Sequence, residues 1–310
     1  MKPNRLTLMT EIDPLLEGLN PQQSEAVTHA GGPLLVVAGA GSGKTRVLTR
    51  RIAFLMSRRN VAPYQILAIT FTNKAAGEMK ERVADLVGPI AKSMWVSTFH
   101  SACVRILRQE ATRLGYSNSF SIYDSADSQR LITIVAKELN LDAKRYPARQ
   151  FQSMISNAKN ELLGPQDYLN AASNPFEQIV ADVYAVYQQR LIRANAMDFD
   201  DLILKTVEVL QRYPEAKARF RSRFRHVLVD EYQDTNHAQY ILVKELVGTE
   251  LEGQAPAELC VVGDADQSIY GFRGATIRNI LQFELDYPNA RTVLLEQNYR
   301  STQNILNAAN

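Results

Sequence analysis

Short, continuous runs of apolar and β-branched residues recur along the chain, and amphipathic helical stretches separate them. Such runs are typical of strands buried on both faces, and their alternation with helices is typical of a parallel sheet. We therefore predict an α/β fold with a parallel sheet covered by helices on both faces. The predicted strands span residues 34–38, 66–70, 94–98, 225–229, 258–264 and 292–296.

The pattern changes between residues 124 and 196. Strand-like runs disappear there, and apolar residues recur at helical spacing, as at Leu131, Ile132 and Val135. We predict an all-α insertion whose Lys and Arg side chains form a solvated face; contact with a nucleic-acid duplex is the less favoured alternative. The predicted division is a flexible leader (1–18), a first domain in two parts (19–123 and 197–296), the insertion (124–196) and the start of another domain (297–310).

A glycine-rich segment follows the first predicted strand and precedes a helix. Strand, glycine loop and helix in this order form a P loop, whose backbone N–H groups surround phosphate oxygens. Lys44 would meet the β and γ phosphates, and the Thr45 hydroxyl would ligate Mg²⁺. Ala38 stands where the usual pattern has a glycine, but that position needs only a small residue. The alternative, a glycine-rich turn with a chance Lys-Thr, is disfavoured. The loop comprises Ala38, Gly39, Ala40, Gly41, Ser42, Gly43, Lys44 and Thr45.

Two acidic residues, Asp230 and Glu231, come directly after a predicted buried strand. In a P-loop protein, one acid at this place holds the Mg²⁺ shell, and its neighbour can orient and deprotonate the attacking water. The alternative is two unremarkable acids at a strand end. The P loop upstream makes the catalytic interpretation much more specific.

Polar and aromatic residues follow several other strands, and ligands of parallel sheets bind beyond the carboxyl ends of the strands. Phe71 and Phe99 fit either the core or surface loops, and their polar neighbours favour surface loops. Further along, Gln267 lies near Tyr270, Phe272 and Arg273. This mixture can sense a phosphate on one side and stack a base on the other.

Two helix starts allow a second interpretation. Asn20 and Pro21 suit the start of a helix, with Gln22 and Gln23 in its first turn. Just before a P loop, an amide there could pair with both edges of adenine. The acids of residues 197–202 suggest a metal, but at a helix start they more often cap the helix and favour its dipole. We prefer the capping interpretation.

Composition narrows the class of protein. A chain of 310 residues suits two domains, and its net charge of +2 gives no global signal for a polyanion, so any nucleic-acid surface must be local. Cys103 and Cys260 lie in apolar runs, which predicts buried thiols in a reducing compartment. No apolar stretch has the length of a signal peptide core or a membrane span. We expect a cytoplasmic protein without membrane contact.

Six segments occur in an order that resembles the UvrD/Rep/PcrA group of superfamily 1 DNA helicases. The resemblance covers nearly everything after Leu19 and is closest to the actinobacterial members of the group. The segments are Ala38-Gly-Ala-Gly-Ser-Gly-Lys-Thr45, Thr70-Phe-Thr-Asn-Lys-Ala75, Thr98-Phe-His-Ser101, Val229-Asp-Glu-Tyr-Gln-Asp-Thr235, Gly263-Asp-Ala-Asp-Gln-Ser-Ile-Tyr270 and Gln297-Asn-Tyr-Arg-Ser-Thr302.

The resemblance implies a RecA-like domain, 1A, split by a helical insertion, 1B, with ATP and Mg²⁺ as cofactors. It implies that Gln23 contacts adenine while Arg46 and Tyr299 pack on its faces. Lys44 and Thr45 would serve the phosphates and Mg²⁺, Asp230 would hold the Mg²⁺ shell, and Glu231 would be the general base. Gln267 would sense the γ-phosphate, and Arg300 would stabilise its charge. The implied single-strand track is Phe71, Asn73, Thr98, His100, Tyr270, Phe272 and Arg273. Many relatives have Trp at the position of Phe272, and Phe is expected to stack less strongly.

The implied activity is that of a single-stranded-DNA translocase and 3′-to-5′ helicase of DNA repair or replication, acting on single strands and 3′-tailed duplexes. In the family a second motor domain, 2A, follows the motif with Arg300. We therefore expect a monomeric N-terminal motor fragment that folds but does not unwind DNA, with DNA-repair proteins as possible partners of the parent. The alternative is a nucleotide- and DNA-binding module with little turnover. A P-loop kinase or metabolic ATPase is disfavoured, because it would not need the polar and aromatic loops.

Overall fold

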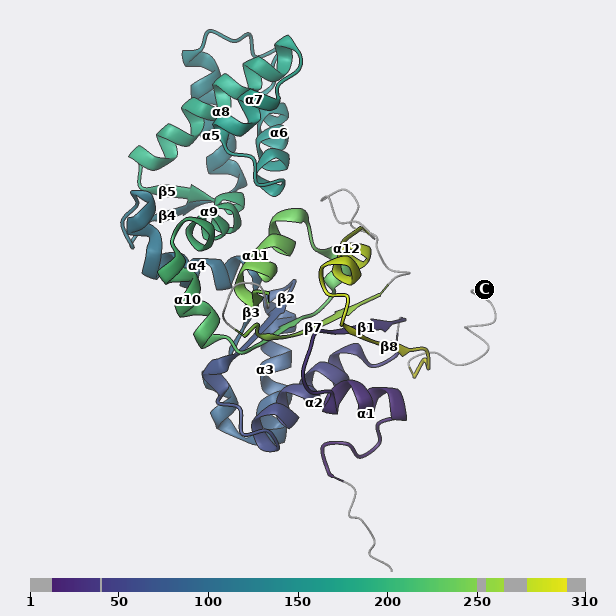
Figure 1. The fold of residues 1–310 in the computed structure, drawn as a ribbon. Coiled ribbons are helices and arrows are strands. Elements are labelled where there is room, and N and C mark those ends of the chain that lie inside the picture. Colours follow the sequence, from purple (N-terminus) through teal and green to yellow (C-terminus); the bar gives the residue numbers. More distant parts are fainter. Residues whose placement is uncertain (1–12, 40, 250–254, 265–277, 300–310) are drawn as a thin grey trace, which may run out of the picture.

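The centre of the molecule is a six-stranded parallel sheet, seen edge-on in the computed structural model of Figure 1. The structure describes residues 13–39, 41–249, 255–264 and 278–299. The strand order is β3-β2-β6-β7-β1-β8, and every neighbouring pair is parallel. The predicted α/β fold is confirmed. The strands are β1 (Leu34–Ala38), β2 (Ile66–Thr70), β3 (Trp95–Thr98), β6 (His226–Val229), β7 (Glu258–Gly263) and β8 (Arg291–Leu295).

One set of helices covers the lower face of the sheet in Figure 1. Alternate residues of β1 face this side, and Leu34 and Val36 pack with the apolar stripes of these helices. The first helix begins as predicted, with Asn20 as its N-cap and Pro21 at its first position. The helices are α1 (Pro21–Thr28), α2 (Lys44–Ser57) and α3 (Asn73–Val87), with the short 3-10 turns η1 (Pro63–Gln65) and η2 (Pro89–Ser93) nearby.

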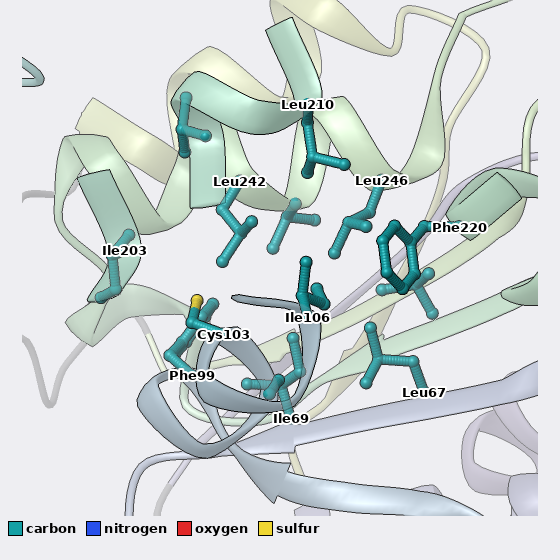
Figure 2. Packing of buried hydrophobic residues seen from close by; sticks show 14 of the residues in the cluster. Leu67, Ile69, Phe99, Cys103, Ile106, Ile203, Leu210, Phe220, Leu242 and Leu246 are labelled. Atoms are coloured by element: carbon teal, nitrogen blue, oxygen red, sulfur yellow. The ribbon is translucent and has the colours of Figure 1, made fainter. Parts of the chain in front are cut away.

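A larger set of helices covers the opposite face. Leu67 and Ile69 of β2 point into this layer, where they meet Phe99 and Ile106 from one helix and Leu246 from another (Figure 2). Cys103 and Cys260 are both buried free thiols, as predicted. The helices are α4 (Phe99–Glu110), α9 (Phe199–Arg212), α10 (Pro214–Arg223), α11 (His237–Val247) and α12 (Arg278–Asp286), with the turns η3 (Ala111–Leu114) and η4 (Tyr232–Asp234).

The helical segment between residues 124 and 195 packs around an apolar cluster of its own and stands at the top of Figure 1. The chain enters and leaves it through two short strands, β4 (Ser121–Tyr123) and β5 (Ala196–Asp198), which pair in parallel. Asp198 then caps α9, so the capping interpretation of these acids is confirmed. The helices are α5 (Ser125–Glu138), α6 (Ala148–Asn160), α7 (Pro165–Ala171) and α8 (Pro175–Arg193). The boundaries assigned to domains 1A and 1B stay predictions.

Part of the expected leader lies against the first domain. Leu15 is buried, the main-chain carbonyl of Pro14 accepts a hydrogen bond from Arg50, and Asp13 binds Arg58 with an O–N distance of 2.6 Å. Residues 13–18 are therefore folded against α2. None of the helices in the described ranges is long and apolar enough to cross a membrane.

Candidate functional site

The P loop turns where β1 ends and α2 begins. Gly41 and Gly43 have φ angles of 74° and 90°, a left-handed conformation that favours glycine. A Cβ added at Gly43 would lie 2.9 Å from the Gln23 amide nitrogen, so a larger residue there would displace the Gln23 side chain. The loop closes through the Ser42 hydroxyl, which donates to the Gly39 carbonyl at 2.7 Å. α2 begins at Lys44, and its N-terminus therefore points unpaired N–H groups at the loop, an arrangement suited to phosphate.

The residues expected around adenine gather beside this loop. Gln23 is buried, and its amide donates to the Ser42 carbonyl and accepts from the Asn20 N–H. The Tyr299 N–H donates to the Gly41 carbonyl at 2.9 Å, and its hydroxyl accepts from the Asn20 amide. The Arg46 side chain is exposed, and a Cβ at Gly18 would lie 3.0 Å from its guanidinium. The structure thus brings Gln23, Arg46 and Tyr299 to one end of the P loop, while their roles toward adenine stay predictions.

The P-loop lysine meets the acids at the ends of two other strands. Lys44 Nζ lies 3.1 Å from Glu231 Oε2 and 3.4 Å from Asp264 Oδ2. Glu231 has a φ of 50°, an unusual left-handed conformation for a residue with a side chain. Such strain costs about 1–3 kcal/mol and persists where the surrounding structure imposes it, often at functional sites. Lys44 and Glu231 are both predicted site residues, whereas Asp264 is not. Asp264 nevertheless follows a buried strand directly, as Asp230 and Glu231 do.

The acids of this site carry more negative charge than Lys44 neutralises. Burial raises the pKa of Asp230 to about 6, and the charge of Glu231 adds to this shift. Burial and Glu231 likewise raise the pKa of Asp234 to about 6. Thr45, Asp230 and Asp234 line one cavity of about 390 Å³. A hydroxyl and carboxylates are the hard oxygen donors that Mg²⁺ prefers, so the donor set fits this cation.

Gln233 and Asp234 are further site residues that sequence reasoning missed. The Gln233 amide donates to Glu231 Oε2 at 2.9 Å and to Asp234 Oδ2 at 3.4 Å. Both residues lie in the segment 229–235, only two and three positions after Glu231. The rule that polar residues after a buried strand reach the site would have found them.

The aromatic residues at the strand ends differ in exposure. Phe99 is 2% exposed and belongs to the core, so the surface-loop prediction was wrong for this residue. Phe71 is half-buried and packs edge-on against Phe99, with 5.8 Å between ring centroids. Thr98 is buried and caps α4. Asn73 is exposed on the first turn of α3, where Thr72 is the N-cap.

A second, larger cavity of about 780 Å³ connects the strand ends with the helical insertion. One face of α6 lines it with Arg149, Ser153 and Asn157, while Phe151 and Ile155 on the other face are buried. The full lining is Thr70, Phe71, Thr98, Phe99, His100, Ser125, Arg149, Ser153, Ser156, Asn157, Asn160, Phe199, Asp200, Asp234, Asn236 and Gln239.

Phe199 lines this second cavity, which we call the groove, but it is not among the predicted site residues. It is 54% exposed, and its ring centroid lies 4.4 Å from that of His100. The sequence carries a signal for this residue, because Phe199 stands between Asp198 and Asp200 at the start of a predicted helix. The exposed ring and His100 form one surface at the edge of the groove.

The charged face of the insertion also requires a correction. The Lys and Arg side chains of residues 124–196 are predicted to form a solvated face, but Lys159 does not belong to it. The Lys159 side chain is completely buried and lies 2.6 Å from Asp198 Oδ2 and 2.9 Å from Asp201 Oδ1. The spacing of apolar residues does not reveal such an ion pair, because both acids come from α9 and β5, far along the chain. The candidates Ala40, Gln267, Tyr270, Phe272, Arg273 and Arg300 lie outside the described residues.

Comparison with known proteins decides the family. A family profile described as the UvrD/REP helicase N-terminal domain matches residues 19–288. The chain belongs to the UvrD/REP helicase family. This agrees with a fold in which a parallel sheet brings a P loop and strand-end acids to one edge.

Individual members of the UvrD/REP helicase family are highly similar to the chain. It is 64% identical over 303 residues to the ATP-dependent DNA helicase UvrD1 of Mycobacterium tuberculosis, with 96% of this chain and 39% of that protein covered. It is 60% identical to UvrD1 of Mycobacterium leprae, with 97% and 40% covered. It is 56% identical to the ATP-dependent DNA helicase PcrA of Bacillus subtilis, with 96% and 39% covered. The chain therefore spans less than half of the length of these relatives.

Proposed function

We propose that this chain is the nucleotide-binding part of an ATP-driven motor that moves along single-stranded DNA, within an ATP-dependent 3′-to-5′ DNA helicase. The observation that carries the proposal is the convergence of Lys44 with Glu231 and Asp264, which joins a P loop to the acids at two strand ends. The relatives' names, ATP-dependent DNA helicase, support the same activity. The 3′-to-5′ direction and action in DNA repair or replication rest on the resemblance of the motifs.

The nucleotide would bind across the P loop. The N–H groups between Gly39 and Thr45 would contact the phosphates, and Lys44 would exchange its carboxylate partners for phosphate oxygens. Thr45 and Asp230 would hold Mg²⁺, which supplies charge neutralisation at the transferred phosphate. Gln23, Arg46 and Tyr299 would bind the base. Gln267 and Arg300 keep their sequence-based roles as γ-phosphate sensor and charge stabiliser.

Glu231 is suited to act as the general base once Lys44 has turned to the phosphates. Its side chain is 37% exposed and lines the same cavity as Thr45 and Asp230, so water can reach it. Asp230 is buried and accepts a hydrogen bond from the Glu231 N–H. This difference in exposure supports the proposed roles, in which the buried acid would hold the metal and the accessible acid would accept the proton of water.

The groove between the strand ends and α6 would continue the single-strand track. Single-strand binding combines aromatic platforms for bases with polar and cationic groups for phosphates. Phe199, His100 and Phe71 provide rings, and the α6 face provides hydroxyls, amides and Arg149. Asn73, Thr98, Tyr270, Phe272 and Arg273 remain sequence-based candidates for the same track. We assign α5–α8 to the 1B insertion, which makes this groove a junction between 1A and 1B.

The test of this proposal is Lys44→Ala, measured as ATP binding by isothermal titration of this chain with Mg²⁺ present. A hydrogen bond to a charged group contributes about 1.5–3 kcal/mol, so the affinity should fall by at least about tenfold. Lys92→Ala is the control, because Lys92 is exposed on η2 at the opposite end of β3. Equal ATP affinity of the Lys44→Ala variant and the unmodified chain would refute the P-loop assignment.

A further inference from the structure

Gln233 is a buried polar residue whose side chain joins two strand ends. It is 1% exposed and belongs to η4, the short turn after β6. Its amide oxygen accepts a hydrogen bond from the Asp264 N–H at 2.9 Å, at the end of β7. Its amide nitrogen donates to Glu231 Oε2 at 2.9 Å. One side chain therefore links the main chain of β7 to the carboxylate proposed as general base.

These contacts close a ring of four residues. Glu231 Oε2 accepts hydrogen bonds from the Gln233 amide and from Lys44 Nζ. Lys44 Nζ also lies 3.4 Å from the Asp264 carboxylate. The Asp264 N–H completes the ring by donating to Gln233. The ring thus connects the P loop, the end of β6 and the end of β7.

The amide of Gln233 has little freedom to turn away. A Cβ added at Gly263 would lie 3.2 Å from the Gln233 oxygen and 3.5 Å from its backbone nitrogen, so β7 passes directly against the side chain. In the same turn, the buried Tyr232 ring packs edge-on against Phe283 of α12, with 5.9 Å between centroids. The Thr235 hydroxyl donates to the Tyr232 carbonyl at 2.7 Å and closes the turn. The turn is held between β7 and α12.

We propose that Gln233 is a positioning residue that keeps the Glu231 carboxylate in place during hydrolysis. When Lys44 turns to the phosphates, the Glu231 carboxylate loses the cation that holds it in this structure. The Gln233 amide stays, because its own position is fixed by Asp264 and by the packing of η4. It then orients the Glu231 carboxylate toward the attacking water. Because the Asp264 N–H holds Gln233, the position of this carboxylate depends on the position of the end of β7. This inference rests on the proposed function.

The test uses the full-length protein, meaning the longer helicase in which this chain is proposed to be the nucleotide-binding part. It compares the steady-state ATP turnover of the unmodified protein with that of the Gln233→Met variant. Methionine keeps the volume of the glutamine side chain but loses both hydrogen bonds. Misplacing a reacting group by about 1 Å can lower a rate by about 100-fold, so kcat should fall by roughly 10- to 100-fold. KM for ATP should stay within about threefold, because the groups proposed to bind the nucleotide and Mg²⁺, Lys44, Thr45 and Asp230, are unchanged. In a Glu231→Gln background, Gln233→Met should cause no further loss, because it acts through Glu231.

Two further variants separate the possible outcomes. Gln188→Met is the matched control: Gln188 is also buried and donates to a carboxylate, Asp201, but lies at the base of the insertion. Gln233→Asn keeps an amide in the buried turn, so it should fold even where Gln233→Met does not. It is one methylene too short to reach both the Asp264 N–H and the Glu231 carboxylate, so it should also lose turnover. Unchanged turnover in Gln233→Asn, or equal losses in kcat and ATP affinity in Gln233→Met, would overturn the inference. If the unmodified protein hydrolyses no more ATP than Lys44→Ala, the proposed function itself fails.

Discussion

Replacing Glu231 with glutamine is expected to lower ATP turnover of the full-length protein by about 10²–10⁴-fold, the usual contribution of a general base. The amide keeps the shape of the side chain and can still face the Gln233 amide, but it cannot accept a proton from water. ATP affinity should be preserved, because Lys44, Thr45 and Asp230 remain. The measurement is the steady-state rate of phosphate release, together with ATP affinity by titration.

Asp230→Ala and Glu81→Gln are the comparison variants for this experiment. Asp230→Ala should lose Mg²⁺-dependent ATP affinity, because it removes the buried acid beside Thr45. Glu81 is exposed on α3, and its replacement should leave both quantities unchanged. If Glu231→Gln weakens ATP binding as strongly as Asp230→Ala, Glu231 belongs to the metal shell and the assigned division of labour is wrong.

Replacing Lys159 with methionine is expected to destabilise the chain by about 3–5 kcal/mol, the cost of breaking a buried ion pair from one side. Burial lowers the pKa of Lys159, but the negative charges of Asp198 and Asp201 together raise it more. The pKa of Lys159 is therefore held well above its usual range. Tyr187 donates to Asp198 at 2.8 Å, and Gln188 donates to Asp201. Without Lys159, two buried carboxylates lose their cation.

Urea unfolding of the Lys159→Met variant measures this cost. Lys137→Met is the control, because Lys137 is exposed on α5. Burial already raises the pKa of Asp201, and acids that lose their cation bind protons more readily. The loss should therefore shrink as the pH falls and the Asp201 carboxylate becomes neutral. Restoring part of the stability with Asp198→Asn and Asp201→Asn would support the same cause. A loss no larger than that of Lys137→Met would show that the ion pair does not stabilise the fold.

Local patterns determined much of the fold. Each strand of the sheet coincides with an apolar run, within about one or two residues, the usual uncertainty of such boundaries. The caps at Asn20, Asp198 and Asn236 were also predictable, because capping depends on residues within one turn. The same holds for the P loop, whose residues are consecutive.

Contacts between distant segments were not predictable in the same way. The ring of Lys44, Glu231, Gln233 and Asp264 joins three strand ends, and the order of strands in the sheet decides which ends meet. Lys159 looked like a surface charge because its partners are 39 and 42 positions away. Phe99 and Phe199 each begin a helix after a short strand, and only tertiary packing buries the first and exposes the second.

The most direct measurement is the rate of ATP hydrolysis by the full-length protein with and without single-stranded DNA. A motor that moves along DNA must couple the nucleotide at the P loop to a strand bound at the neighbouring ends of the same sheet. We predict that oligo(dT) raises the rate severalfold or more, and that Glu231→Gln abolishes the stimulated rate. Hydrolysis at the same rate with and without DNA, or no hydrolysis under either condition, would contradict the account and favour a simple ATPase or a binding module.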